Sequence, residues 1–228
     1  MVRILAHRGA SRVARENTLE AFVAARRLGA DGVELDARAS ADGAVVVHHD
    51  AEIPGVGVIA TLAVADLPPH VPLLDAAIDA CGDLIIDVEL KELPGEPGYD
   101  AGYPVARLVA RLLAERELLG RTVVSSFDLM ALEAALETEP ALTTGWLTPR
   151  WFHPPTALET LRGLGHRAWH PEREAITEDL VAQAHEAGLE ITTWTVDDPE
   201  AIRRLACAGV DGIITNVPDL ARAALATD

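Results

Sequence analysis

The chain has 228 residues, 49% of them hydrophobic and 4% aromatic, a composition typical of globular proteins that excludes a disordered or fibrous one. Its 36 acidic and 19 basic residues give a net charge of -17, which repels nucleic acid backbones and anionic membranes at long range and argues against nucleic acid as a partner. The first apolar run, residues 2–6, is too short for a signal peptide, and no apolar run approaches the roughly 18 residues of a membrane span. We therefore expect a cytoplasmic protein without a stable membrane anchor.

Short apolar runs alternate with segments of helical spacing along the chain. In the first helical segment Asn17 is the predicted N-cap, Glu20 follows three positions later, and Gly29 ends the helix. The predicted strands are residues 2–6, 32–37, 84–89, 122–126, 142–147, 167–169, 189–194 and 210–215, with a further extended run at 45–47. The remaining predicted helices are residues 73–81, 104–117, 128–137, 156–163, 177–187, 199–207 and 218–226.

Eight strand-helix pairs without a linker indicate an α/β protein. The pattern favours a (β/α)8 TIM barrel of parallel strands, a single domain over residues 1–228, in preference to a doubly wound open sheet. In such a barrel the active site gathers at the carboxyl ends of the strands. Polar and aromatic residues fall at those ends: His7, Arg8, Glu34, Asp36, Glu89, Lys91, Ser125, Ser126, Trp146, Trp194 and Asn216. This placement predicts a functional site at that rim.

Glu34 and Asp36 are two residues apart on the second predicted strand. Their side chains therefore project from one face, while Val33 and Leu35 project from the other. Two carboxylates about 4 Å apart repel by about 4 kcal/mol at an effective dielectric of about 20, so they share either a proton or a cation. An isolated pair of this kind is typical of a solvated strand edge. Glu89 and the histidines that follow other strands favour a divalent metal site instead.

The sequence closely resembles the glycerophosphodiester phosphodiesterase family from residue 7 to residue 218. The matching segments are His7-Arg8-Gly9, Glu16-Asn17-Thr18, Gly29-Ala30-Asp31, Glu34-Leu35-Asp36, Asp42-Gly43, His49-Asp50, Glu89-Leu90-Lys91, Ser126-Phe127, Trp194-Thr195-Val196 and residues 209–216. Any one segment is weak evidence, but their order on the predicted strands is specific. The resemblance implies a TIM barrel and a metal-dependent hydrolase. Glu34, Asp36 and Glu89 would hold Mg²⁺ or Ca²⁺, and His7 and His49 would act as acid and base.

The chemistry of phosphodiester cleavage agrees with this residue set. A phosphodiester repels nucleophiles, so a site must neutralise its oxygens, as a metal with Arg8 and Lys91 can do. Histidine has a pKa that suits both accepting and donating a proton near neutral pH. The resemblance further implies that a hydroxyl of the substrate's own glycerol attacks, giving a cyclic phosphate that water opens. It also implies that Trp194 forms an apolar wall for the glycerol.

His48 and His49 compete for one role, because successive strand residues face opposite ways. The family pattern selects His49, immediately before Asp50, and leaves His48 outside the site. Asp87 shares a face with Lys91, so it is expected deeper in the barrel, where orienting Lys91 is one alternative.

Several reactive residue types have no partner motif. His70, His153, His166, His170 and His185 are expected to be surface or packing residues. Cys81 and Cys207 lie in apolar helical patterns, where a free thiol behaves as a small core residue. Two such cysteines indicate neither a disulfide framework nor a metal site.

The sequence departs from the family pattern in two places. The connection at residues 51–72 is a short insertion where family members carry a longer cap, so an open pocket is expected, able to accept a bulkier head group or a lysophospholipid. Asp197 stands where the family usually has Asn, and Asn216 where it usually has Asp. These opposite exchanges leave the charge of the site unchanged if the two positions are close.

The predicted function is metal-dependent hydrolysis of small glycerophosphodiesters to sn-glycerol 3-phosphate and an alcohol. A lysophospholipase D or sphingomyelinase D-like enzyme is the alternative that shares the barrel, the two histidines and the Glu-x-Asp pair, but Glu89 with Lys91 fits the diesterase pattern. A non-catalytic barrel that binds a phosphate ligand is a further alternative, although the expected catalytic positions are filled. An isomerase or aldolase barrel is disfavoured, because the sequence has no resemblance to its phosphate loop and no isolated Schiff-base lysine.

Overall fold

The computed structural model describes residues 2–226 of the chain. Within this range eight parallel strands close into a barrel, because β1 pairs with both β2 and β11. The barrel strands are β1 (Arg3–His7), β2 (Gly32–Ala39), β6 (Ile85–Leu90), β7 (Thr122–Ser126), β8 (Thr144–Thr148), β9 (Ala168–Pro171), β10 (Glu190–Thr193) and β11 (Gly212–Thr215). This closure confirms the predicted TIM barrel.

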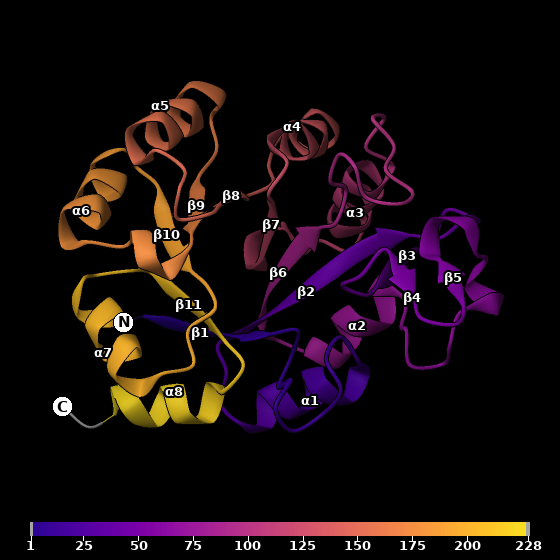
Figure 1. Ribbon diagram of the computed structural model, residues 1–228, viewed down its shortest axis with the longest axis horizontal. Helices are drawn as coiled ribbons and strands as arrows, with labels where there is room; N and C mark the ends of the chain where they lie inside the picture. The colour runs from indigo at the N-terminus through magenta and orange to yellow at the C-terminus, as the bar shows by residue number, and fades with distance from the viewer. Residues whose placement is uncertain (1, 227–228) are drawn as a thin grey trace.

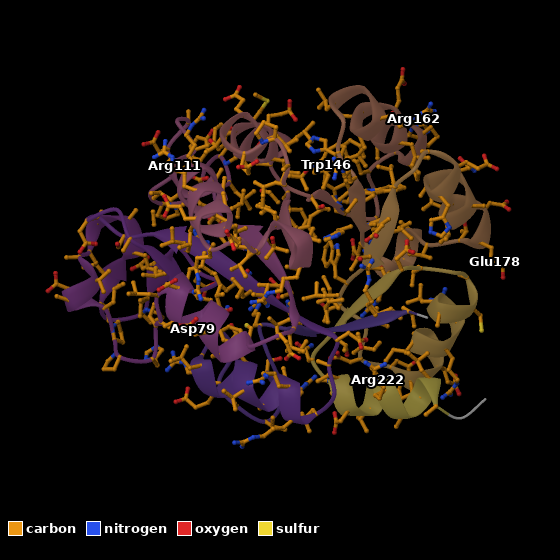
Figure 2. All side chains as sticks on the ribbon, turned by 180° about the vertical axis from the view of Figure 1, so that it is seen from behind. Asp79, Arg111, Trp146, Arg162, Glu178 and Arg222 are labelled. Carbon is orange, nitrogen blue, oxygen red and sulfur yellow. The ribbon has the colours of Figure 1, made fainter. Side chains whose placement is uncertain are left out.

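Helices follow the barrel strands and lie outside them (Figure 1). They are α1 (Leu19–Arg27), α2 (Leu74–Cys81), α3 (Pro104–Glu115), α4 (Leu129–Thr138), α5 (Pro154–Leu164), α6 (Glu178–Glu186), α7 (Pro199–Cys207) and α8 (Pro218–Leu225). Charged side chains such as Asp79, Arg111, Arg162 and Glu178 stand on the outer helices, whereas Trp146 of β8 lies in the interior (Figure 2). No helix in this part of the chain is both long and apolar enough to cross a lipid bilayer.

The apolar core fills the layer between strands and helices. Cys81 is fully buried at the end of α2, as predicted. The same prediction was wrong for Cys207, which is exposed. Helix α7 buries Ile202 and Leu205. Successive helix residues are rotated by about 100° around the helix axis, so Cys207 points away from this buried face.

The start of α1 differs from the prediction by one residue. Thr18 is the N-cap, and its Oγ1 accepts a hydrogen bond from the amide of Ala21 at 3.3 Å. Asn17 instead has a φ of 57°, in the left-handed region that asparagine tolerates. Its Nδ2 donates to Oδ2 of Asp36 at 2.7 Å. Asn17 therefore holds a rim carboxylate rather than the helix terminus.

The connection between β2 and α2 carries small elements of its own. Strand β3 (Val45–Val47) pairs antiparallel with the end of β2. Residues 51–72 contain the hairpin of β4 (Glu52–Ile53) and β5 (Gly57–Val58), and then two single turns of 3₁₀ helix, Ile59–Thr61 and Val64–Asp66. Val46, Ile53 and Ile59 form a small apolar cluster under these elements, separate from the main core. Figure 1 shows this insertion at one side of the barrel, beside the end of β2.

Candidate active site

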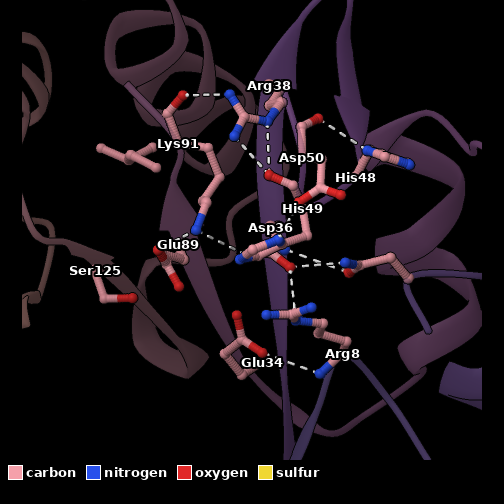
Figure 3. A network of polar contacts seen from close by, with 12 residues as sticks. Arg8, Glu34, Asp36, Arg38, His48, His49, Asp50, Glu89, Lys91 and Ser125 are labelled. Atoms are coloured by element: carbon pink, nitrogen blue, oxygen red, sulfur yellow. Dashed lines mark hydrogen bonds and ion pairs between the residues drawn. The ribbon is translucent and has the colours of Figure 1, made fainter. Parts of the chain in front are cut away.

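Strand register brings the acidic side chains of β2 next to those of its neighbours. His7 of β1 pairs with Glu34 of β2, and Asp36 of β2 pairs with Glu89 of β6. Paired residues on parallel neighbours point to the same side of the sheet, so these side chains converge. His49 follows β3 and reaches the same region (Figure 3).

Glu34, Asp36 and Glu89 form a cluster of buried carboxylates. One oxygen from each lies within 4.8 Å of the others. Oε1 of Glu34 and Oδ1 of Asp36 are buried and accept no hydrogen bond from any described residue. Buried carboxylate oxygens without a hydrogen-bond partner are costly, and an all-oxygen donor set suits a hard divalent cation. The three residues therefore fit a metal of the Mg²⁺ or Ca²⁺ type.

Burial and mutual repulsion shift the pKa values of this cluster apart. Burial, with Asp36 and Glu89 adding repulsion, raises the pKa of Glu34 well above its ordinary value. Burial also raises the pKa of Glu89 to about 7, against the opposing charge of Lys91. For Asp36 burial acts in the same direction, but Lys91 and Arg8 outweigh it and its pKa is lowered. A bound cation would relieve the repulsion that remains between the carboxylates.

Two cations border the carboxylates. Nε of Arg8 lies 3.3 Å from Oδ2 of Asp36, and the backbone amide of Arg8 donates to Oε2 of Glu34 at 3.0 Å. Nζ of Lys91 donates to Oε1 of Glu89 at 2.9 Å and lies 3.6 Å from Oδ1 of Asp36. Both cations line the same cavity, so they are placed to contact an anion that enters it.

The two predicted histidines approach the cluster from different elements. Nδ1 of His7 lies 2.8 Å from Oδ1 of Asn216, and its Nε2 lies 3.9 Å from Oε2 of Glu34. Nδ1 of His49 lies 2.7 Å from Oδ1 of Asp50. Burial lowers the pKa of both imidazoles, and the charge of Arg8 adds to this effect.

His48 takes the opposite direction from its neighbour. Its Nδ1 lies 2.9 Å from the carbonyl oxygen of Asp50, and it is not among the described residues that line the cavity. Figure 3 shows His48 directed away from the carboxylates and His49 directed towards them. The two histidines thus point in different directions as predicted, although both lie just after β3 and not within the strand.

A cavity of about 220 Å³ lies over these groups. It is lined by His7, Arg8, Glu34, His49, Glu89, Lys91, Ser125, Phe127, Leu147, Trp194, Thr195 and Ile214. Trp194 and Phe127 form an apolar wall, with ring centroids 5.4 Å apart at 85°. Nε1 of Trp194 donates to the carbonyl of His170 at 2.8 Å, which fixes the indole. Of the predicted catalytic, phosphate-binding and metal-binding residues, all except Asp36 line this cavity, and Asp36 lies fully buried behind them.

Besides Asp36, three residues predicted at the rim do not line the cavity: Ser126, Trp146 and Asn216. Trp146 was expected at the rim, but it is 8% exposed, and its Nε1 donates to the carbonyl of Phe127 at 3.2 Å. Leu147 lines the cavity in its place, because successive strand residues face opposite ways. Ser126 donates to the carbonyl of Leu90 at 3.2 Å, and Ser125 takes the cavity face.

Arg38 holds the loops around the site and was missed in the sequence analysis. Its Nε and Nη2 donate to the carbonyl oxygen of His49 at 2.9 and 2.5 Å, and its Nη1 donates to that of Lys91 at 3.1 Å. Glu96 pairs with it at 3.0 Å. Arg38 continues the series Glu34, Asp36 at the same two-residue spacing, which was the available signal.

A second polar network lies beneath the cavity floor. Ser125 Oγ donates to Oδ1 of Asp87 at 2.7 Å, and Nδ1 of His170 lies 3.4 Å from Oδ2 of Asp87. Asp87 thus lies deeper than Glu89, as predicted, and no described hydrogen bond or ion pair joins it to Lys91, whose partners are Glu89 and Asp36. His170 is a packing residue as predicted, 2% exposed against Gly145.

The burial of His170 leads to a prediction about stability and pH. Burial lowers its pKa to about 4, below the ordinary value of about 6.5 of the unfolded chain. The unfolded state therefore binds the proton first, so this stabilisation is present above pH 6.5 and is lost as the pH falls towards 4. Between pH 7.5 and 4.5 the loss is about 2 to 3 kcal/mol. Urea unfolding should show a drop for the wild type that is larger by about this amount than for His170→Gln.

In the wild type and in His170→Gln alike, Asp87 has the opposite effect on the pH dependence of stability. Burial raises its pKa to about 7, so its contribution to stability rises as the pH falls. The comparison of wild type with His170→Gln therefore isolates the histidine. His153→Gln, at an exposed histidine, serves as the matched control and should keep the wild-type drop. Equal pH dependence in the wild type and His170→Gln would contradict the prediction.

Comparison with known proteins agrees with this arrangement. The profile of the Glycerophosphoryl diester phosphodiesterase family matches residues 7–220. A glycerophosphodiester phosphodiesterase of Caldanaerobacter subterraneus subsp. tengcongensis is 29% identical, over 95% of this chain and 94% of its own. A solved structure from Silicibacter pomeroyi, described as a glycerophosphoryl diester phosphodiesterase, has a TM-score of 0.88 at 29% identity, covering 99% of this chain and 93% of its own.

An Oleispira antarctica phosphodiesterase, solved in complex with sn-glycerol-3-phosphate, shares the fold at a TM-score of 0.87 and 24% identity, covering 99% of this chain and 97% of its own. The family profile spans nearly the whole chain, including the strand ends that carry the carboxylates and histidines. The chain therefore belongs to the glycerophosphoryl diester phosphodiesterase family and is a phosphoric diester hydrolase.

Proposed function

We propose that this protein hydrolyses glycerophosphodiesters to sn-glycerol 3-phosphate and an alcohol, with a divalent cation held by Glu34, Asp36 and Glu89. The carrying observation is one cavity lined by two histidines, two cations and two of the three clustered carboxylates, with the third, Asp36, buried directly behind it. Membership of the family supports the reaction class. The sn-glycerol-3-phosphate complex of the Oleispira antarctica protein supports the product, although that protein is only 24% identical.

The metal proposed for this site is Mg²⁺ or Ca²⁺, because all the donors are carboxylate oxygens. When bound, it supplies positive charge against the developing charge of the phosphoryl oxygens. The chain adds charge of its own. Arg8 and Lys91 border the carboxylates at 3.3 and 2.9 Å, so they are placed to bind the phosphate oxygens of a substrate.

Trp194 and Phe127 exclude water from the opposite wall of the cavity and pack against the carbon atoms of the glycerol. The cavity measures about 220 Å³, so the part of the substrate that lies against this wall must be small. The indole is held by its hydrogen bond to the carbonyl of His170, so the wall is rigid.

His7 and His49 move the protons. Each has Nδ1 on a fixed oxygen acceptor, at 2.8 and 2.7 Å, which leaves Nε2 to exchange a proton with the substrate. One imidazole removes the proton of the attacking glycerol hydroxyl while the other donates a proton to the departing alcohol. When water opens the cyclic phosphate, the two groups act in the reverse sense. A bound phosphodiester anion favours the imidazolium form of either histidine.

A lysophospholipase D-like activity is the second candidate, and one observation favours it. Val13, Met130 and Trp151 are 65%, 57% and 79% exposed. They lie in or next to the connections that follow β1, β7 and β8, on the face where the cavity opens. Large apolar side chains at the mouth of a site suit the acyl chain of a lysolipid.

Turnover of glycerophosphocholine tests the proposal. The purified protein is assayed by enzyme-coupled detection of sn-glycerol 3-phosphate with Mg²⁺, with Ca²⁺ and with EDTA. We expect product with at least one metal and none with EDTA. Release of choline from lysophosphatidylcholine without any release of glycerol 3-phosphate would move the assignment to the second candidate. Silence on both substrates in the presence of either metal would contradict both.

A further inference from the structure

Asp197 and Asn216 are joined in a tight hydrogen-bonded pair behind His7. The Nδ2 of Asn216 donates to Oδ2 of Asp197 at 2.8 Å, and its backbone amide donates to Oδ1 of Asp197 at 2.8 Å. The hydroxyl of Thr215 also donates to Oδ1, at 3.1 Å. The two departures from the family pattern are therefore adjacent, and their opposite exchanges of charge compensate.

This pairing fixes which way the Asn216 side chain points. An ionised carboxylate only accepts hydrogen bonds, so Nδ2 of Asn216 must face Asp197. Hydrogen bonds and the Arg12 side chain, 3.4 Å away, keep Asp197 ionised, since its pKa lies below the ordinary value despite burial. The carbonyl Oδ1 of Asn216 is then left for the other side, where Ser11 donates to it at 2.9 Å.

The same carbonyl oxygen determines the proton position on His7. Oδ1 of Asn216 lies 2.8 Å from Nδ1 of His7, and an amide oxygen accepts but cannot donate. Nδ1 of His7 must therefore carry a proton. In the neutral imidazole Nε2 then has the free lone pair, and this nitrogen lies on the side of Glu34 and the cavity.

We propose that Asp197 is a positioning residue that acts through Asn216 to hold His7 in the Nδ1-protonated tautomer, with Nε2 presented to the substrate. The inference rests on the proposed function of His7 as a proton-transferring group. Asp197 itself does not line the cavity within the described structure, so it does not touch the reacting atoms. Its effect is confined to the identity of the ring nitrogen that exchanges the proton.

Asp197→Asn tests the proposal with little change in shape. The substituted side chain keeps an acceptor for the backbone amide of Asn216, but it no longer forces Nδ2 of Asn216 away from His7. We expect kcat to fall by roughly 10- to 100-fold, as when residues that orient catalytic or metal-binding histidines are removed. KM should stay within about twofold, because substrate contacts are intact. Nitrogen-15 NMR of the His7 ring should show Nδ1–H in the wild type and a loss of this preference in the variant.

The exchanged pair, Asp197→Asn with Asn216→Asp, is the decisive second variant. Here the new amide at position 197 donates to the new carboxylate at position 216, and that carboxylate accepts from Nδ1 of His7, so the tautomer and most of kcat should return. Asn216→Asp alone places two carboxylates where atoms now lie 2.8 Å apart and should stay impaired. Asp198→Asn is the matched control, since Asp198 is an exposed helix cap and asparagine caps equally well.

Two results would overturn the proposal. One is an Nε2-protonated His7 in the wild type, and the other is an Asp197→Asn variant with unchanged kcat and unchanged ring signals. The NMR measurement needs no turnover. A protein without phosphodiesterase activity that still shows the predicted tautomer would therefore contradict the proposed function and leave the hydrogen-bond relay intact. Thermal unfolding of each variant shows that a loss of kcat is measured on folded protein.

Discussion

His49→Ala is expected to lower kcat by roughly 10² to 10⁴, the range typical for loss of a general acid or base. His7→Ala should do the same, because the proposed mechanism places the two imidazoles at opposite ends of one displacement. Neither histidine belongs to the carboxylate cluster. Titration calorimetry should therefore show metal affinity close to that of the wild type for both variants, while steady-state kinetics with glycerophosphocholine report the loss.

His48→Ala supplies the matched control for this experiment. It is the same substitution one residue earlier, at a side chain that contacts only the carbonyl of Asp50 among the described hydrogen bonds. We expect nearly full activity. An inactive His48 variant beside an active His49 variant would reverse the assignment of the two neighbours.

Glu34→Gln is expected to change metal affinity and metal-free stability in opposite directions. The variant loses one of the three carboxylates, so metal affinity should fall by at least about 100-fold, with activity falling in parallel. In the metal-free protein the same change removes a buried acid that repels Asp36 and Glu89, so the unfolding temperature should rise. Calorimetric metal titration and thermal unfolding with and without Mg²⁺ or Ca²⁺ measure the two effects.

Glu52→Gln is the control for that pair of measurements, since Glu52 is an exposed carboxylate of the insertion. It should leave metal affinity and both unfolding temperatures unchanged. Unaltered metal binding in Glu34→Gln would remove Glu34 from the ligand set, whatever its effect on activity.

The barrel could be predicted because its signal is repeated and local. Each strand is a short apolar run, each helix has its own spacing, and their alternation restricts the fold to parallel sheets. The role of an individual residue, such as the N-cap of α1, has no such repeated signal. Asn17 and Thr18 are both good N-caps by composition, and only the position of Asp36 decides that Asn17 turns towards the rim.

The carboxylate cluster could be predicted because Glu34 and Asp36 share a strand face and Glu89 ends the next barrel strand. Trp146 was misplaced because β8 is buried on both faces, so its sequence does not reveal which alternate residues point inward. The contact between His7 and Asn216 joins residues 209 positions apart. No local pattern encodes such a contact; it arises from the register between β1 and β11.

That register has a consequence for the synthesis of the protein. The three carboxylates and both histidines lie within the first 89 residues, yet β11, which is followed by the partner of His7, comes after the other seven barrel strands along the chain. A partly made chain can thus contain every group that we propose handles the phosphate while β1 still lacks a neighbour on one side. We expect activity only once β11 has paired with β1 and closed the barrel, because Asn216 then reaches His7. Activity that appears during translation would report the moment of barrel closure.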